Sequence, residues 1–154
     1  MLNIDEFLCR FLRGECSRWP DAAGDAFADD LLARAGYHGV LPLVHDRLQR
    51  APASAQGWPP RVLQACRDDG LGHAMWELHH RDRLTRVLTQ LATINVRHVL
   101  FKGTALAYRN YPQAALRVRS DTDLIIAPEA RPEAAAVLEA LGFSKQLDAG
   151  GDFV

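Results

Sequence analysis

The chain has 154 residues, of which 48% are hydrophobic and 24% charged, and 18 basic residues nearly balance 19 acidic ones. A chain of this length is about one domain long and can bury a core. The formal net charge of -1 gives no bulk signal for a nucleic-acid or membrane partner, although a local basic patch is compatible with it.

The cysteines and the first residues indicate the compartment. Cys9, Cys16 and Cys66 form no CxxC pair, which is typical of reduced thiols. Asp5 and Glu6 lie where a secretory leader would be basic, and no run approaches the roughly 18 apolar residues of a membrane span. We therefore expect a soluble, cytoplasmic protein without a membrane partner.

The first fifty residues have the periodicity of helices. Apolar side chains recur at helical spacing in three segments, residues 4–12, 25–36 and 40–50. Gly14 and Gly36 are expected to end the first two helices, because glycine is common just past a helix C-terminus. The N-terminal part is thus predicted to be all-helical.

A stretch containing Ala, Ser, Gly and Pro follows at residues 51–60. It is either a linker or a surface loop, and we favour the loop. Trp58 and the later Trp76 are expected to anchor a core or this linker. We predict two units, a helical lead-in over residues 1–58 and a core over residues 59–154.

Residues 61–95 are predicted to be helical, with an interruption near the glycines at 70–72. The clearest stripe repeats at i, i+3, i+4 and i+7 through Leu84, Val87, Leu88, Leu91 and Ile94. The charged stretch 77–86 is then expected to be the solvated face of this helix. 

Cys66, His73, His79 and His80 lie in the same predicted helix. Their spacing matches no zinc site, since structural zinc ligands come in closely spaced pairs such as CxxC. We expect surface or interface histidines and a buried thiol.

The hydrophobic period changes after residue 95. Residues 96–101 are short, apolar and β-branched, as in a buried strand, and a helix over 105–111 follows until Pro112. A second strand is predicted at 122–127, and a third at 143–147. Between these two strands, Pro132 opens a helix that Gly142 closes. The order predicts an α+β fold, with a helical N-terminal half before a small mixed sheet.

Lys102, Gly103 and Thr104 come directly between the first predicted strand and its helix. A helix N-terminus offers unpaired N–H groups and a partial positive charge, which together bind phosphate. Glycine removes the Cβ that would hold a ligand away from the backbone. The alternative is that the glycine serves only the turn.

Asp121 and Asp123 lie one residue apart where the second strand begins. Residues i and i+2 of a strand point to the same face, so the two carboxylates repel each other unless a cation lies between them. Two carboxylates with phosphate oxygens are a usual environment for Mg²⁺. The alternative is a polar, solvated strand start.

The two features support each other if the strands are antiparallel neighbours. The end of the first strand and the start of the second would then meet at one edge of the sheet, and a phosphate-binding turn would face two metal ligands. A nucleoside triphosphate with Mg²⁺ requires this layout.

The same residues carry a family resemblance. The chain resembles the uncharacterised nucleotidyltransferase family of the DNA polymerase beta superfamily over residues from about 60 to 145, and more loosely before them. The matching elements, in order, are Lys102-Gly103, Tyr111-Pro112, Arg117, Asp121-x-Asp123 and Gly142-Phe143.

The resemblance implies transfer of a nucleotidyl group from a nucleoside triphosphate, with Mg²⁺, to an acceptor that is a protein, an RNA or a small molecule. It implies that Asp121 and Asp123 hold the metal and that Gly103 and Thr104 hold the triphosphate. Lys102, with Arg117 or Arg119, would neutralise phosphate charge.

The resemblance also implies a third carboxylate on a later strand. Asp148 and Asp152 follow too soon after the last helix to supply it. We expect either a fragment or a degenerate member, and the alternative function is an inactive binding or regulatory module of the same fold. A homodimer would be one way to cover an open sheet edge or helix face.

Overall fold

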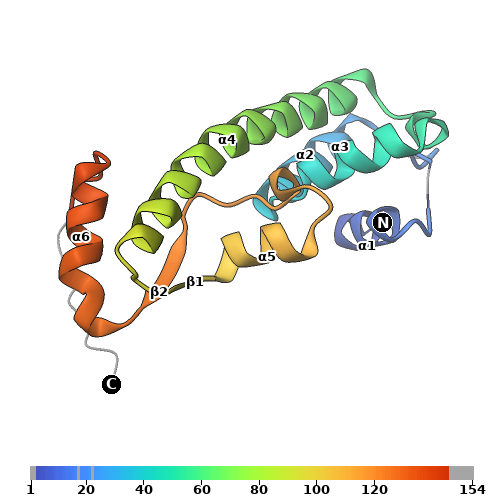
Figure 1. The fold of residues 1–154 in the computed structure, drawn as a ribbon. Helices are drawn as coiled ribbons and strands as arrows, with labels where there is room; N and C mark the ends of the chain where they lie inside the picture. Colours follow the sequence, from blue (N-terminus) through green and yellow to red (C-terminus); the bar gives the residue numbers. More distant parts are fainter. Residues whose placement is uncertain (1–2, 17, 22, 146–154) are drawn as a thin grey trace.

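The structure, a computed structural model, describes residues 3–16, 18–21 and 23–145 (Figure 1). Most of these residues are helical, and the described part contains one sheet of two strands. The predicted α+β class is therefore confirmed. Among the described residues, no helix combines the length and the apolar character needed to cross a membrane.

The helical N-terminal half is confirmed. Asn3 caps the first helix by accepting hydrogen bonds from the N–H groups of Asp5 and Glu6. The elements of this half are α1 (Ile4–Arg13), α2 (Asp25–Tyr37), α3 (Leu41–Arg50), a 3-10 turn (Pro52–Ala55) and the start of α4 (Pro60–Thr93).

An aromatic cluster forms the core of this half. Phe11 is fully buried, and its ring centroid lies 4.8 Å from that of Trp58. The predicted loop at 51–60 therefore contributes Trp58 to the core instead of separating two bodies. Val62 and Cys66 of α4 belong to the same core, which thus continues across the boundary that we predicted at residue 58.

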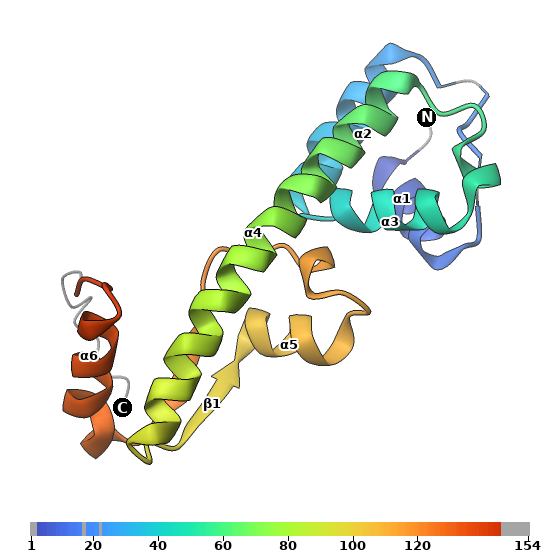
Figure 2. The ribbon, with the colours of Figure 1, turned by 45° about the horizontal axis from the view of Figure 1, so that its top comes forward.

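Helix α4 is a single helix of 34 residues that runs the length of the molecule (Figure 2). The predicted interruption at residues 70–72 is wrong. A glycine inside a helix costs about 1 kcal/mol relative to alanine, which packing can outweigh. At Gly70 the packing reason is visible, because a Cβ there would lie 3.0 Å from Cδ2 of His45 on α3.

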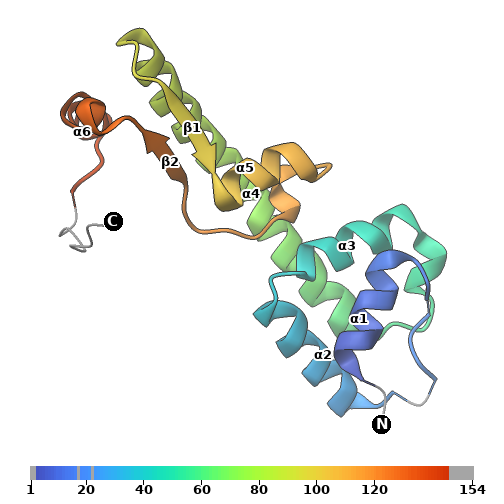
Figure 3. The same ribbon diagram turned by 90° about the horizontal axis from the view of Figure 1, so that it is seen from below.

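The second half is built on the C-terminal part of α4. Strands β1 (His98–Phe101) and β2 (Asp123–Ile126) pair antiparallel, with His98 opposite Ile126 and Phe101 opposite Asp123 (Figure 3). The remaining elements are α5 (Lys102–Asn110), a 3-10 turn (Ala114–Leu116), a second 3-10 turn (Pro128–Ala130) and α6 (Arg131–Ala140).

The C-terminal helix and the predicted third strand have different outcomes. Helix α6 ends as expected, with Gly142 in the left-handed region at φ 85°. Residues 143–145 form no strand, and residues 146 and 147 lie outside the described residues. 

The sheet has one covered face and one open face. Leu124 and Ile126 pack on a small core of Val87, Leu91, Val96 and Ala134, which also receives α6. On the other face Val99, Phe101 and Ile125 are 61%, 47% and 51% exposed. The second half therefore buries far less apolar surface than the aromatic cluster does.

Candidate functional site

The end of β1 and the start of β2 meet, as the antiparallel prediction requires. Phe101 is the register partner of Asp123, and Nζ of Lys102 lies 3.4 Å from Oδ1 of Asp123. Lys102 is exposed and Asp123 is partly exposed. Surface ion pairs contribute about 0–1 kcal/mol, so a ligand can displace this one at small cost.

Lys102, Gly103 and Thr104 form the first turn of α5 itself and not a loop before it. Within the described part of the chain, no side chain caps the N-terminus of α5, so its first N–H groups remain available to an anion. Lys102 has a φ of 50°, in the left-handed region, which costs a non-glycine residue on the order of 1 kcal/mol. Such residues are concentrated at binding and catalytic sites.

The hydroxyl of Thr104 has a different role from the one that the family resemblance implied. Its side chain is buried at 1% exposure, and its hydroxyl donates a hydrogen bond to the carbonyl oxygen of Asp121 at 3.1 Å. The hydroxyl also lies 3.1 Å from that of Thr122. The hydroxyl of Thr104 therefore holds the acidic segment in place, and only its backbone can face a phosphate.

Arg119 also points inward. Its side chain is 3% exposed and forms an ion pair with the 9% exposed Glu77 of α4. Its Nη1 donates to the carbonyl oxygens of Ala114 and Arg117, at 2.9 and 3.2 Å. The guanidinium predicted to neutralise phosphate thus joins residues 114–119 to α4. 

Arg117 is half-buried, and its side chain makes no hydrogen bond or ion pair with any described residue. Of the two predicted arginines, it is the one left to meet a ligand.

Glu77 uses both carboxylate oxygens inside the protein. One oxygen accepts a hydrogen bond of 2.8 Å from the hydroxyl of Tyr108, and the other pairs with Arg119. Burial and the bond to Glu77 raise the pKa of Tyr108 to about 12. The prediction that residues 77–86 are a solvated face is wrong at Glu77, because the 3-10 turn at 114–116 packs on α4 and the side chains of Tyr108 and Arg119 cover Glu77.

His80 is a second residue that the sequence analysis missed. Its Nε2 lies 2.7 Å from the hydroxyl of Thr122, the residue that stands between Asp121 and Asp123 in the sequence. Its ring stacks on that of Trp76, with 4.4 Å between the ring centroids. Burial, and then the positive charge of Arg119, lower the pKa of His80 below its ordinary value. A signal was available: the buried stripe of Leu84 and Val87, extended backwards at helical spacing, reaches positions 80 and 77.

The donor set for a metal is small. Among the described residues, no three or more His, Cys, Asp or Glu side chains converge in a possible metal site. Asp121 and Asp123 are two carboxylates, and Asp148 and Asp152 lie outside the described residues. Cys66 is in the aromatic core, where burial raises its pKa to about 12, as expected for a buried thiol.

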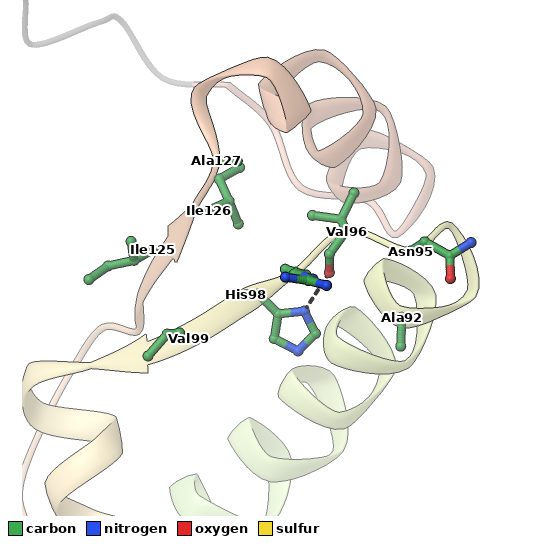
Figure 4. Close-up of a pocket in the computed structure, with 9 residues that line it drawn as sticks. Ala92, Asn95, Val96, His98, Val99, Ile125, Ile126 and Ala127 are labelled. Atoms are coloured by element: carbon green, nitrogen blue, oxygen red, sulfur yellow. Dashed lines mark hydrogen bonds between the residues drawn. The ribbon is translucent and has the colours of Figure 1, made fainter.

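A hollow of about 1030 Å³ lies at the opposite end of the strands from Asp123 (Figure 4). Among the described residues, the polar side chains that line it are those of Asn95, Arg97 and His98, and none of them is a carboxylate. The side chain of His98 is held there by a 3.0 Å hydrogen bond to the carbonyl oxygen of Val96. We therefore place the candidate site at the acidic edge and not in this hollow.

Comparison with curated proteins and with solved structures finds no match. A sequence model of the uncharacterised nucleotidyltransferase family matches residues 25–152, from α2 to beyond α6. The match includes the first turn of α5 and both aspartates, which the fold brings to one edge. Since it covers well over half of the chain, the protein belongs to the uncharacterised nucleotidyltransferase family.

Proposed function

We propose that the acidic edge binds a nucleoside triphosphate with Mg²⁺ and transfers its nucleotidyl group to an acceptor. The acceptor oxygen or nitrogen would lose its proton to solvent and form a bond to the α-phosphorus. The bond from that phosphorus to the oxygen that bridges the α- and β-phosphates would break, and pyrophosphate would leave with that oxygen. The meeting of the first turn of α5 with Asp123 carries the proposal. The two ends meet because β1 and β2 pair antiparallel.

The residues of the first turn of α5 would hold the triphosphate. The uncapped N–H groups present partial positive charge, and exposed Lys102 adds a full charge beside them. Arg117, whose guanidinium has no protein partner among the described residues, is a further cation for the phosphates. Phosphate chemistry of this kind depends mainly on positioning and charge neutralisation.

Gly103 supports the close approach of a ligand to the backbone of this turn. A Cβ at Gly103 would lie 3.7 Å from the Cβ of Arg119, which is ordinary contact, and its φ is not in the left-handed region. The fold therefore has no need for glycine here. A ligand that approaches the backbone would need it.

Asp121 and Asp123 would hold Mg²⁺ together with phosphate oxygens. Their hard oxygen donors suit this ion, which is usually bound through one or two carboxylates and substrate phosphates. When bound, the ion would neutralise charge that develops on the phosphates. 

A binding or regulatory module is the second candidate. It is favoured by the presence of two carboxylates, and not three, among the described residues. Such a module would bind the nucleotide and release no pyrophosphate.

Nucleotide binding tests the proposal. ATP, CTP, GTP and UTP, each with Mg²⁺, would be compared by thermal shift, since a ligand at a hundred times its Kd stabilises the fold by about 2.7 kcal/mol. We expect at least one nucleotide to stabilise the protein, and Asp121→Asn or Asp123→Asn to remove this Mg²⁺-dependent gain. Absence of stabilisation by all four, or unchanged affinity in both variants, would contradict it. Pyrophosphate release then separates the enzyme from the module.

Gly103→Ala sharpens the test at the turn. We expect it to keep the unfolding free energy of the wild type, because the added methyl group makes only ordinary contact with Arg119. We expect it to weaken nucleotide binding at least about tenfold, because a Cβ there would hold the phosphates away from the backbone. Gly72→Ala is the matched control, since a Cβ at Gly72 meets nothing within 4 Å. Equal nucleotide affinity in the two variants would exclude contact between phosphate and the backbone at Gly103.

A further inference from the structure

Three side chains form a continuous hydrogen-bonded row behind the acidic pair. Nε2 of His80 lies 2.7 Å from Oγ1 of Thr122, which lies 3.1 Å from Oγ1 of Thr104. Oγ1 of Thr104 in turn lies 3.1 Å from the carbonyl oxygen of Asp121. The row therefore joins α4, the segment of the aspartates and the first turn of α5.

Proton counting gives this row one direction. The carbonyl oxygen of Asp121 can only accept, so Thr104 must donate its single hydroxyl proton to it. Thr104 then accepts from Thr122, which thereby uses its own single proton. Thr122 can only accept from His80, so Nε2 of His80 carries a hydrogen.

The surroundings of His80 agree with a neutral ring that is protonated at Nε2. Nδ1 is buried and has no hydrogen-bond partner among the residues that the structure describes. A hydrogen on Nδ1 would be a buried donor without an acceptor, which is costly. The nearby Arg119 also disfavours a positive charge on the ring, whereas Glu77 favours it less strongly. 

The ring is also fixed in orientation. It stacks on Trp76 with an interplanar angle of 17°. Trp76 is itself in contact with Arg119, whose guanidinium carbon lies 5.2 Å from the ring centroid of Trp76. Nε2 is thus aimed at Thr122 before any ligand binds.

We infer that His80 is a positioning residue for the acidic pair: as a neutral Nε2–H donor it holds Thr122 and, through Thr104, sets both aspartates against the first turn of α5. Its role in metal binding rests on the proposed function, whereas its role in holding residues 121–123 does not. No ligand contact is assigned to His80 itself.

Three substitutions isolate the hydrogen bond from the packing. His80→Gln keeps an N–H donor near the position of Nε2, whereas His80→Phe keeps a flat ring for Trp76 and removes the donor. Thr122→Val deletes the middle hydroxyl without changing α4. His79→Phe is the control, since His79 is the exposed neighbour of His80 in the same helix.

Three measurements apply to each variant of the full chain. Long-range ¹H–¹⁵N NMR reports the tautomer of His80 in the wild type. Amide hydrogen exchange at residues 121–124 reports how firmly the segment is held. Mn²⁺ alone, titrated by the paramagnetic relaxation of water, reports the acidic pair without nucleotide or turnover.

The wild type should show the Nε2–H tautomer. Loss of one hydrogen bond is worth about 1 kcal/mol, so His80→Phe and Thr122→Val should each speed exchange at 121–124 and weaken Mn²⁺ binding about five- to tenfold. His80→Gln should recover most of both losses, and His79→Phe should match the wild type. Recovery by glutamine separates donation at Nε2 from simple packing.

An Nδ1–H tautomer or a charged ring at neutral pH would overturn the inference. So would unchanged exchange in both His80→Phe and Thr122→Val. If His80→Phe fails to fold, amide exchange at residues 121–124 in Thr122→Val still decides whether the hydrogen-bonded row holds this segment. If the wild type binds no Mn²⁺, the proposed function fails, while the tautomer and the exchange rates still decide whether His80 holds the segment.

Discussion

The two ends of α4 bury their side chains in different ways. At its N-terminal end, the rings of Phe7, Phe11 and Trp58 pack with other aromatic side chains in a large closed core. At its C-terminal end, a two-stranded sheet rests on a core with four buried members among the described residues and leaves an apolar face open. The candidate site lies between the two, on the part of α4 that carries Glu77 and His80.

This difference indicates a division of roles. A two-stranded sheet is marginal by itself, so the second half depends on α4 for its position. The aromatic core fixes one end of α4. The hydrogen bond from His80 to Thr122 and the ion pair of Glu77 with Arg119 then fix the acidic segment relative to α4. Regions of low local stability are often those that bind ligands.

The largest expected effect is in the aromatic core. Phe11→Ala should lower the free energy of unfolding by about 4 kcal/mol, because Phe11 is fully buried and its removal leaves a cavity. Phe101→Ala is the matched control on the open sheet face and should cost less than about 1 kcal/mol. Urea unfolding measures both. Equal losses would mean that the two ends are equally packed.

Next is the buried ion pair between the ends. Arg119→Met should cost about 3 kcal/mol, because Glu77 would remain buried without its cation. The double variant Arg119→Met/Glu77→Gln should recover part of this loss, which urea unfolding in a double-mutant cycle would measure. Additive losses would show that the two side chains are not coupled.

A smaller difference is expected in native-state hydrogen exchange. Amides in the ladder of β1 and β2 should open with a free energy at least about 1 kcal/mol below that of amides in α4 near Val62, because less apolar surface covers them. Equal protection would show that both ends open only by global unfolding.

The smallest effect is a dependence on pH that belongs to the second half. The pKa of His80 is lowered in the folded state from its ordinary value of 6.5, so the unfolded chain binds this proton first as the pH falls. The contribution of neutral His80 to the unfolding free energy is fully present above about pH 6.5, and it is lost as the pH falls towards the lower pKa of the folded state. The unfolding free energy of the wild type should therefore fall more steeply than that of His80→Gln between about pH 7.5 and about pH 5.5. Parallel curves would contradict the shift.

Several parts of the fold were predictable because they depend on neighbours in the sequence. Helical periodicity in 4–12 and 25–36, and the change of period after residue 95, reported the elements correctly. The continuity of α4 through Gly70 was not predictable, because the residue that packs closely on Gly70, His45, lies on another helix. The intrinsic cost of a glycine inside a helix is outweighed at Gly70 by packing against His45.

The site divides in the same way. The sequence by itself determined the acidic pair, the lysine-glycine turn, the antiparallel meeting of their strands as an expectation, and membership of the family. Only the tertiary structure decided that Thr104 and Arg119 face inward and that Glu77 and His80 support the acidic segment. The helical stripe could place Glu77 and His80 on the buried side of their helix, but their partners lie 42 positions away in the chain, and a local pattern does not identify such partners.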